Sequence, residues 1–231
     1  MSGKSLVRDP SSFPAAVFDL DGTLIDYEMV SHAAFAEVLA GLGCPEYPWE
    51  IHASIVGTTP PHWSKVITEK MSVSEKISAE EFARRYFEVV AKKYEDIPPM
   101  AGAIELLEAL KERGVKMAIA TSTPRASFTE KIRFHPRLTE LIPQVVCGDE
   151  VEKGKPAPDI FLEAARRLAT DPGDCVVFED SPHGVTAAVA AGMASVALPD
   201  PRLPGNDFSH ATWILGGIGE WIAKIDQGTS A

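Results

Sequence analysis

The sequence predicts an α/β protein whose core is a Rossmann-like, doubly wound parallel sheet with an inserted α-helical cap domain. Short apolar runs without polar alternation recur along the chain, as in strands that are buried on both faces. Amphipathic helical segments separate most of these runs, which is the order of a parallel sheet covered by helices. Residues 29–94 show helical patterns only, and this interval is far too long for one crossover helix.

Six apolar runs are the expected strands, and three helices are expected between them. In the third helix, Ser181 and Pro182 precede the apolar stripe and Gly192 follows it, which is the order of an N-cap, a first-turn proline and a C-terminal glycine. The strands are expected at residues 15–18, 115–120, 145–147, 175–178, 195–198 and 213–215, and the helices at residues 103–110, 160–168 and 182–191.

The helical interval is predicted to form a separate domain. The core domain is expected to comprise residues 1–27 and 96–231, and the cap residues 28–95. Linkers are expected at residues 24–27 and 97–99, where two consecutive prolines end a helix and stiffen the chain. An insert after the first strand of an open parallel sheet lies over the carboxyl ends of the strands, where ligands bind in such folds.

Composition excludes several classes of protein. The 231 residues are 45% hydrophobic and 24% charged, which is a globular mixture rather than that of a disordered chain. The net charge of −11 argues against nucleic acid or an anionic membrane as a partner. Three scattered cysteines indicate reduced thiols in a cytoplasmic protein. Neither a membrane span nor a secretory signal is expected, because no long apolar run occurs.

Acidic and polar residues follow four of the expected strands. Because the carboxyl ends of parallel strands meet at one edge of the sheet, these side chains are expected to lie together. The set comprises Asp19, Asp21, Thr121, Ser122, Lys155, Glu179 and Asp180.

Phosphoryl transfer is the chemistry that needs such a set. The Asp19 carboxylate can attack phosphorus without a base and form an aspartyl-phosphate. Mg²⁺ held by Asp180, Asp19 and Glu179 would reduce the repulsion between this carboxylate and a phosphate dianion. Asp21, on a turn that Gly22 permits, is placed to protonate the leaving oxygen and then to activate water.

The remaining members of the set suit a bound phosphoryl group. Thr121 can donate a hydrogen bond to a phosphoryl oxygen, and Lys155 can neutralise the charge that develops there. Thr121, Ser122 and Lys155 are therefore the expected phosphate-binding residues.

Four segments, in order across residues 15–215, resemble the motifs of the haloacid dehalogenase-like hydrolase superfamily. Residues 19–23, Asp-Leu-Asp-Gly-Thr, resemble its nucleophile motif DxDGT. Thr121 matches its second motif, Lys155 within Gly-Lys-Pro-Ala-Pro-Asp its third, and the Glu179-Asp180 pair its fourth. Lys153 is the alternative to Lys155, but Lys-Pro-x-Pro begins at Lys155.

The resemblance implies a role for each matched position. Asp19 would be the nucleophile and Asp21 the general acid/base, while Asp19, the Asp21 backbone carbonyl and Asp180 would hold Mg²⁺. The chain looks closest to the subgroup of capped sugar-phosphate phosphatases that contains pseudouridine 5′-phosphatase. It departs from the family at Tyr27, where a small hydroxyl residue commonly follows the aspartate.

Most histidine and aromatic side chains are expected to have packing or surface roles rather than catalytic ones. The four histidines singled out are expected on the surface or in packing, with His183 the strongest candidate for a role because it follows Asp180. The aromatic residues of the interval are expected to form the cap core. These residues are His32, His62, His135 and His183, and Trp49, Phe82, Tyr86 and Phe87.

Three functions remain open. The first is a Mg²⁺-dependent phosphatase of a small phosphomonoester, either a sugar phosphate or a nucleoside or pseudouridine 5′-phosphate. The second is a phosphosugar mutase of the β-phosphoglucomutase type. Such mutases resemble one another in a Gly-x-x-Arg cap loop, whereas residues 57–60 here read Gly-Thr-Thr-Pro; this and Thr23 favour hydrolysis. The third, a silent binding module, is disfavoured because Asp19 and Asp21 are both present.

The expected partner is a small phosphorylated metabolite, and the chain is expected to be a monomer or a weak homodimer. Substrate choice is expected to reside in the cap, around residues 55–61 and the helix that carries Tyr86. The cap is expected to close over the sheet edge by hinging at the two linkers, because the open edge cannot exclude water by itself.

Overall fold

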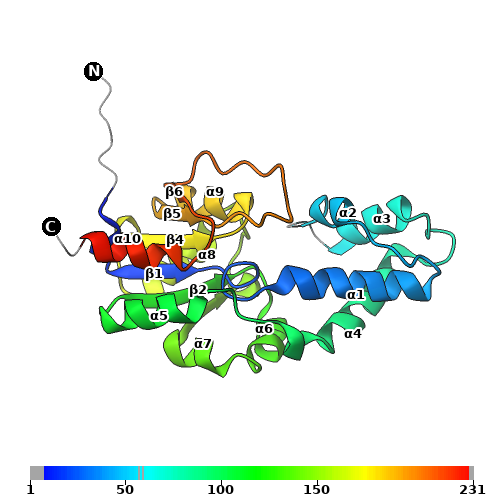
Figure 1. Cartoon of the computed structure of the whole chain (residues 1–231), viewed down its shortest axis with the longest axis horizontal. Coiled ribbons are helices and arrows are strands. Elements are labelled where there is room, and N and C mark those ends of the chain that lie inside the picture. The colour runs from blue at the N-terminus through cyan, green and yellow to red at the C-terminus, as the bar shows by residue number, and fades with distance from the viewer. Residues whose placement is uncertain (1–7, 57, 59, 229–231) are drawn as a thin grey trace, which may run out of the picture.

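The core of the molecule is a six-stranded parallel sheet with the strand order β3-β2-β1-β4-β5-β6 (Figure 1). The computed structural model of the chain describes residues 8–56, 58 and 60–228. All six predicted strands are confirmed, each within one residue of its expected ends. They are β1 (Ala15–Phe18), β2 (Lys116–Thr121), β3 (Gln144–Cys147), β4 (Cys175–Glu179), β5 (Ala194–Ala197) and β6 (Trp213–Ile214).

The central strand β1 is apolar at every position because helices cover both faces of the sheet. In β1, Ala16 and Phe18 pack into one apolar layer, while Ala15 and Val17 pack into the other, as the pleat requires. The predicted α/β, Rossmann-like fold class is thereby confirmed. One face carries α5 (Ala103–Glu112), α7 (Pro136–Leu141) and α10 (Glu220–Gly228), and the other carries α8 (Asp159–Arg167) and α9 (Pro182–Ala190).

The start of α9 follows the predicted signals. The Ser181 hydroxyl accepts a hydrogen bond from the Gly184 N–H at 3.0 Å, and Pro182 is the first helical residue. Gly192, beyond the end of the helix, has φ +76°. The remaining short elements of the core are α6 (Arg125–Ile132) and the 3₁₀ turns η1 (Pro10–Ser12), η2 (Tyr94–Asp96), η3 (Gly148–Glu150) and η4 (Pro172–Asp174).

Four helices form a layer beyond one end of the sheet, on the right in Figure 1. This confirms the helical prediction for the interval, while its status as an independent domain stays a prediction. Tyr86 stacks on Phe35 with 3.9 Å between ring centroids and meets Trp63 edge-on at 5.1 Å. Phe82 is fully buried as predicted, but Phe87 is 47% exposed, so its assignment to the cap core is wrong. The helices are α1 (Tyr27–Gly41), α2 (Trp49–Ala53), α3 (Pro60–Lys70) and α4 (Ala79–Ala91).

The two linkers between this layer and the sheet run side by side. Ile25 forms an antiparallel bridge with Pro99, and the Asp26 N–H donates to the Pro98 carbonyl at 2.9 Å. Both segments lie within the predicted linkers. The cap layer is therefore joined to the core by one paired crossing of the chain.

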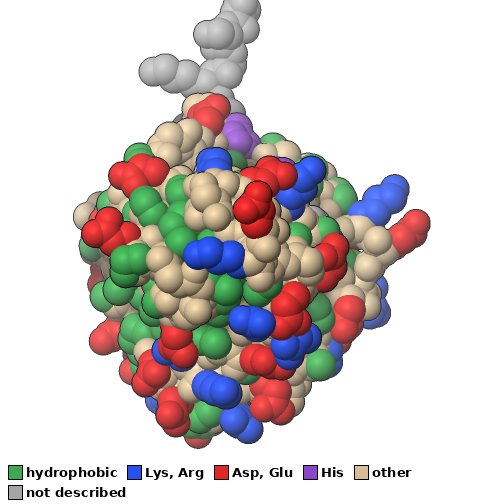
Figure 2. Space-filling view, turned by 90° about the vertical axis from the view of Figure 1, so that its right-hand side faces the viewer, with side chains coloured by type: hydrophobic (Ala, Val, Ile, Leu, Met, Phe, Trp, Pro, Cys, Tyr) green, Lys and Arg blue, Asp and Glu red, His purple; other side chains and the backbone are tan. Residues whose placement is uncertain are grey.

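Two observations concern the surface. None of the helices in the described ranges combines the length and apolar composition that a membrane crossing requires. The outer face of the cap end carries Lys and Arg side chains interspersed with Asp and Glu (Figure 2). That mixture is unlike the broad basic face that nucleic-acid binding uses. The choice of a small metabolite as partner stays a prediction.

Candidate active site

The strand register places the predicted site residues at one edge of the sheet. Phe18 of β1 lies opposite Ile119 of β2 on one side and Phe178 of β4 on the other. The residues that follow these positions therefore lie at the carboxyl edge where the strand order reverses, the usual ligand-binding crevice of such sheets. The first residues there are Asp19, Thr121 at the end of β2 and Glu179 at the end of β4.

Lys155 connects two of these strands. Its Nζ lies 2.6 Å from Asp19 Oδ1 and 2.6 Å from Glu179 Oε1, and it donates to the Ala120 carbonyl at 3.1 Å. Burial alone would lower the pKa of Lys155, but the charges of Asp19 and Glu179 raise it above its ordinary value. Lys153 is exposed, so the structure brings Lys155 and not the alternative lysine to Asp19.

Glu179 is held by contacts on both carboxylate oxygens. Oε1 accepts from Lys155, and Oε2 accepts from the Ser181 N–H at 3.0 Å and its hydroxyl at 2.9 Å. Gly184 leaves room for it, because a Cβ there would lie 1.8 Å from Oε1. The geometry therefore makes Glu179 the partner that positions Lys155, while its place among the metal ligands stays a prediction.

Asp21 faces two residues that lie outside the four motifs. Lys131 Nζ lies 2.6 and 2.8 Å from its two carboxylate oxygens, and the Thr123 hydroxyl donates to Oδ2 at 2.8 Å. Lys131 is only 2% exposed. The sequence does hold a signal for it: Lys131 shares the buried face of α6 with Phe128 and Ile132, a place where lysine requires a partner.

Asp19 and Asp180, at the same edge, each have a carboxylate oxygen that accepts no hydrogen bond from a described residue and could therefore bind a cation. Within the described residues, Asp180 and the Oδ2 atom of Asp19 have no hydrogen-bond donor. Asp180 lies against Gly22, which has φ +86°, and a Cβ on that glycine would lie 2.1 Å from Asp180 Oδ2. Burial raises the pKa of both carboxyls; Lys155 opposes this rise, and the charge of Glu179 adds to it.

This donor set fits a hard divalent cation. Two crowded carboxylates with free oxygens, close to the backbone of the Asp21–Gly22 turn, are what Mg²⁺ binds in proteins. No three side chains of His, Cys, Asp or Glu in the described ranges form a metal-binding group by themselves. A cation here would therefore depend on a backbone carbonyl, on water or on substrate oxygens to complete its ligands.

The predicted phosphate-binding hydroxyls lie on the loop after β2. Thr121 Oγ1 accepts from the Thr123 N–H at 3.1 Å, which leaves the hydroxyl hydrogen free to donate. Ser122 is exposed and lines the pocket that opens toward the cap. Gly148 packs against this loop so tightly that a Cβ would lie 2.3 Å from the Ser122 carbonyl oxygen.

A pocket of about 450 Å³ lies between this loop and the cap helices. Its polar lining includes Ser31, the Tyr27 and Tyr86 hydroxyls, which lie 3.0 Å apart, and Glu28. His52, which the sequence analysis did not select, places its Nε2 2.7 Å from Glu28 Oε2. No lysine or arginine is among the described residues that line this pocket. Gly57 and Thr59, on which the mutase comparison partly rests, lie outside the described residues.

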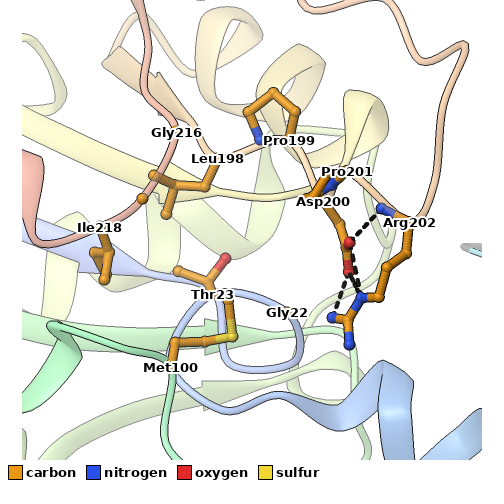
Figure 3. A pocket seen from close by; sticks show the side chains of 11 residues that line it. Gly22, Thr23, Met100, Leu198, Pro199, Asp200, Pro201, Arg202, Gly216 and Ile218 are labelled. Carbon is orange, nitrogen blue, oxygen red and sulfur yellow. Dashed lines mark hydrogen bonds and ion pairs between the residues drawn. The ribbon is translucent and has the colours of Figure 1, made fainter.

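A smaller pocket, of about 180 Å³, is lined by the Gly22–Thr23 turn, Met100 and the core segments 198–202 and 216–218 (Figure 3). Arg202 on its rim pairs with Asp200 and also with Asp26, whose Oδ1 lies 2.8 Å from Nη2. Because Asp26 directly precedes α1, this ion pair ties the start of the cap to a loop of the core. Thr23 also lines this pocket, and its buried hydroxyl has no hydrogen-bond partner among the described residues.

The histidines that the sequence analysis discussed show no catalytic contacts. His32 stacks on Trp49 with 4.1 Å between centroids and contacts the Tyr47 carbonyl, so it packs within the cap as predicted. His183 is exposed beside Asp180. His135 is 8% exposed, and burial and then the charge of Lys131 lower its pKa.

The chain belongs to the haloacid dehalogenase-like hydrolase family, because its residues 16–198 match the sequence pattern of that family. It is 39% identical over 210 residues to a probable pseudouridine-5′-phosphatase of Drosophila melanogaster, covering 89% of this chain and 90% of that protein. It is 35% identical to (DL)-glycerol-3-phosphatase 2 of Arabidopsis thaliana, covering 86% and 83%.

The structural comparison agrees with the family. A putative β-phosphoglucomutase of Thermotoga maritima superposes with a TM-score of 0.76 at 31% identity, covering 92% of this chain and 98% of that one. Because both of these relatives in sequence are named phosphatases, the chain is a phosphatase of this family that acts on small phosphorylated substrates.

Proposed function

We propose that the chain is a Mg²⁺-dependent phosphatase that hydrolyses a phosphomonoester with an uncharged, hydroxyl-rich leaving group through an aspartyl-phosphate on Asp19. A sugar phosphate or a nucleoside 5′-phosphate, including pseudouridine 5′-phosphate, has this chemistry. The observation that carries the proposal is the buried Asp19–Lys155–Glu179 cluster, with 2.6 Å contacts, at a sheet edge next to a pocket that has no lysine or arginine among its described lining residues.

Asp19 would attack the phosphorus with its free Oδ2, while Lys155 holds the other oxygen. The Lys155 ammonium keeps positive charge beside the reacting oxygens, and Glu179 fixes the position of that ammonium. Thr121 has a hydroxyl hydrogen available for a phosphoryl oxygen. Mg²⁺, held by Asp19, Asp180 and the Asp21 carbonyl, would offset the negative charge of the carboxylate and the phosphate.

The cap pocket supports the choice of leaving group. A second phosphate on the substrate would meet Glu28 and no described lysine or arginine in this pocket, which disfavours a bisphosphate. Hydroxyls of Ser31, Tyr27 and Tyr86 offer hydrogen bonds to a polyol, and the exposed Phe87 ring offers a flat apolar surface. The same reasoning disfavours the mutase alternative, in which a sugar bisphosphate must bind.

A substrate panel tests the proposal. Phosphate release should be measured with Mg²⁺ on sugar and nucleoside monophosphates and on the matching bisphosphates. We expect the monophosphates to be hydrolysed with kcat/KM at least about 100-fold above that of the bisphosphates, a discrimination of roughly 3 kcal/mol. Transfer of the phosphoryl group to a second sugar hydroxyl in place of water would establish the mutase instead.

Asp19→Asn tests the nucleophile. The amide keeps the shape but lacks the ionised oxygen, so turnover should fall by about 1,000-fold or more. Asp171→Asn is the matched control, because Asp171 lies before β4 at the opposite edge of the sheet and an asparagine can keep its hydrogen bond to the Gly173 N–H. Phosphate release by Asp19→Asn within tenfold of the wild type would refute the covalent route.

A cap exchange tests where specificity resides. Replacing residues 29–95 by the cap of a related phosphatase should change the preferred monoester and leave the Mg²⁺ requirement unchanged. If the chimera folds and keeps the original preference, specificity resides in the core loop that contains Ser122, which also lines the pocket.

A further inference from the structure

We propose that Lys131 is a positioning residue for the general acid/base Asp21, and that Tyr27 and Tyr94, one at each of the two chain crossings between cap and core, hold Lys131 in place. This inference rests on the proposed function, in which Asp21 moves the protons. Lys131 is buried and lies outside the motifs that define the site.

The first observation is the contact between Lys131 and Asp21. Both Asp21 carboxylate oxygens lie within 2.8 Å of Lys131 Nζ, and the Thr123 hydroxyl contacts one of them. A carboxylate with three such contacts is fixed in rotamer and direction. Lys131 itself is 2% exposed, so its position is set by packing rather than by solvent.

The second observation is what surrounds the ammonium group. Lys131 Nζ lies 3.9 Å from the ring centroid of Tyr27 and 5.8 Å from that of Tyr94. Tyr27 is the first residue of α1 and Tyr94 begins η2, so each ring belongs to the chain beside one of the two linkers. The two paths between core and cap therefore converge on one lysine.

The Tyr27 ring also connects this lysine to the substrate pocket. Its hydroxyl lies 3.0 Å from that of Tyr86 on α4, and both side chains line the pocket. A shift of α1 relative to the core would move the ring off Lys131 and change the support of Asp21. The position of the cap and the position of the acid/base are thus coupled through packed side chains.

The reaction shows what such positioning must achieve. In the first step an Asp19 oxygen bonds to phosphorus, the bond from phosphorus to the leaving oxygen breaks, and that oxygen takes the proton of the Asp21 carboxyl group. In the second step Asp21 takes a proton from water as the water oxygen bonds to phosphorus and the bond to Asp19 breaks. Inorganic phosphate leaves, and Asp19 and protonated Asp21 are regenerated. Both steps need Asp21 within hydrogen-bond reach of a particular oxygen.

The two steps can be separated with p-nitrophenyl phosphate, whose leaving group departs without protonation. For Lys131→Met we expect a burst of about one nitrophenolate per active site, followed by turnover at least about 50-fold slower than in the wild type. On an alkyl phosphomonoester from the substrate panel, both steps should slow and no burst should appear. Lys131→Gln, which keeps a polar group at the end of the side chain, should show the same pattern with a smaller loss of turnover, of about tenfold or more.

Lys116→Met is the matched control. Lys116 donates to the Leu168 and Ala169 carbonyls at the other end of β2, so its loss removes a lysine without touching the site. The control should match the wild type on both substrates. Asp21→Asn should show the burst pattern in a more severe form, because it removes the group that Lys131 positions.

The outcomes separate the two proposals. A wild type without phosphatase activity on any monoester would refute the proposed function itself. If the wild type is active, and the burst amplitude and the turnover rate of Lys131→Met are reduced by the same factor, Lys131 has a merely structural role. Turnover within threefold of the wild type in both Lys131 variants would equally overturn the inference.

Discussion

Replacing Gly184 by alanine should destabilise the protein, against the rule for helical glycines. Gly184 is the third residue of α9, where alanine ordinarily stabilises a helix by about 1 kcal/mol. A Cβ at this position would lie 1.8 Å from Glu179 Oε1, so the Glu179 carboxylate has to move. Glu179 is 1% exposed and holds Lys155, and separating a buried ion pair costs about 3–5 kcal/mol.

The net expectation is a loss of about 2–4 kcal/mol in the free energy of unfolding. For a chain of this size that lowers the midpoint of thermal unfolding by roughly 5–15 °C. Turnover should fall as well, because Lys155 loses one of the two carboxylates that position it. Thermal unfolding followed by circular dichroism, together with phosphate release, measures both effects.

Two controls make the reasoning refutable. Gly41→Ala, at the end of α1, meets no atom within 4 Å and should be neutral or slightly stabilising. In a Glu179→Ala background, Gly184→Ala should cost nothing further, which is a coupling of about 2 kcal/mol or more between the two sites. If Gly184→Ala is neutral, or if its cost is the same in both backgrounds, the contact with Glu179 does not govern this position.

Asp180→Asn should raise the unfolding midpoint of the EDTA-treated protein, because it removes a carboxyl group whose pKa is raised by burial. The same variant should need about tenfold more Mg²⁺, or more, for half-maximal activity. An unchanged Mg²⁺ requirement counts against Asp180 as a ligand. Burial raises the pKa of Cys147 and Cys175 to about 11, so iodoacetamide should modify Cys44 alone in the native protein and all three cysteines in urea, and native modification of either buried thiol contradicts this. Burial lowers the pKa of His135, so the unfolded chain binds its proton more readily, and the free energy of unfolding should fall as the pH is lowered from about 6.5. His135→Leu should flatten that slope, and an equal slope in the variant would show that another group is responsible.

The sequence by itself determined the fold class and most of the edge residues. Strands buried on both faces are mostly apolar, so the central strands were recognisable in the sequence as short apolar runs without alternation. A parallel sheet brings the carboxyl ends of its strands together, and this placed Asp19, Thr121, Lys155 and Glu179 at one edge before any contact was known. The local signals of α9 sufficed for its start, because capping depends on neighbours in the chain.

Only the tertiary structure decided which groups meet across that edge. Lys131 lies 110 positions from Asp21 in the sequence, and no local pattern states that the two pair. Glu179 contacts Lys155 through one carboxylate oxygen and Ser181 through the other, and the Lys155 contact joins elements 24 positions apart. These contacts depend on the order and packing of distant elements, whereas strand and helix patterns record only which face of each element is buried.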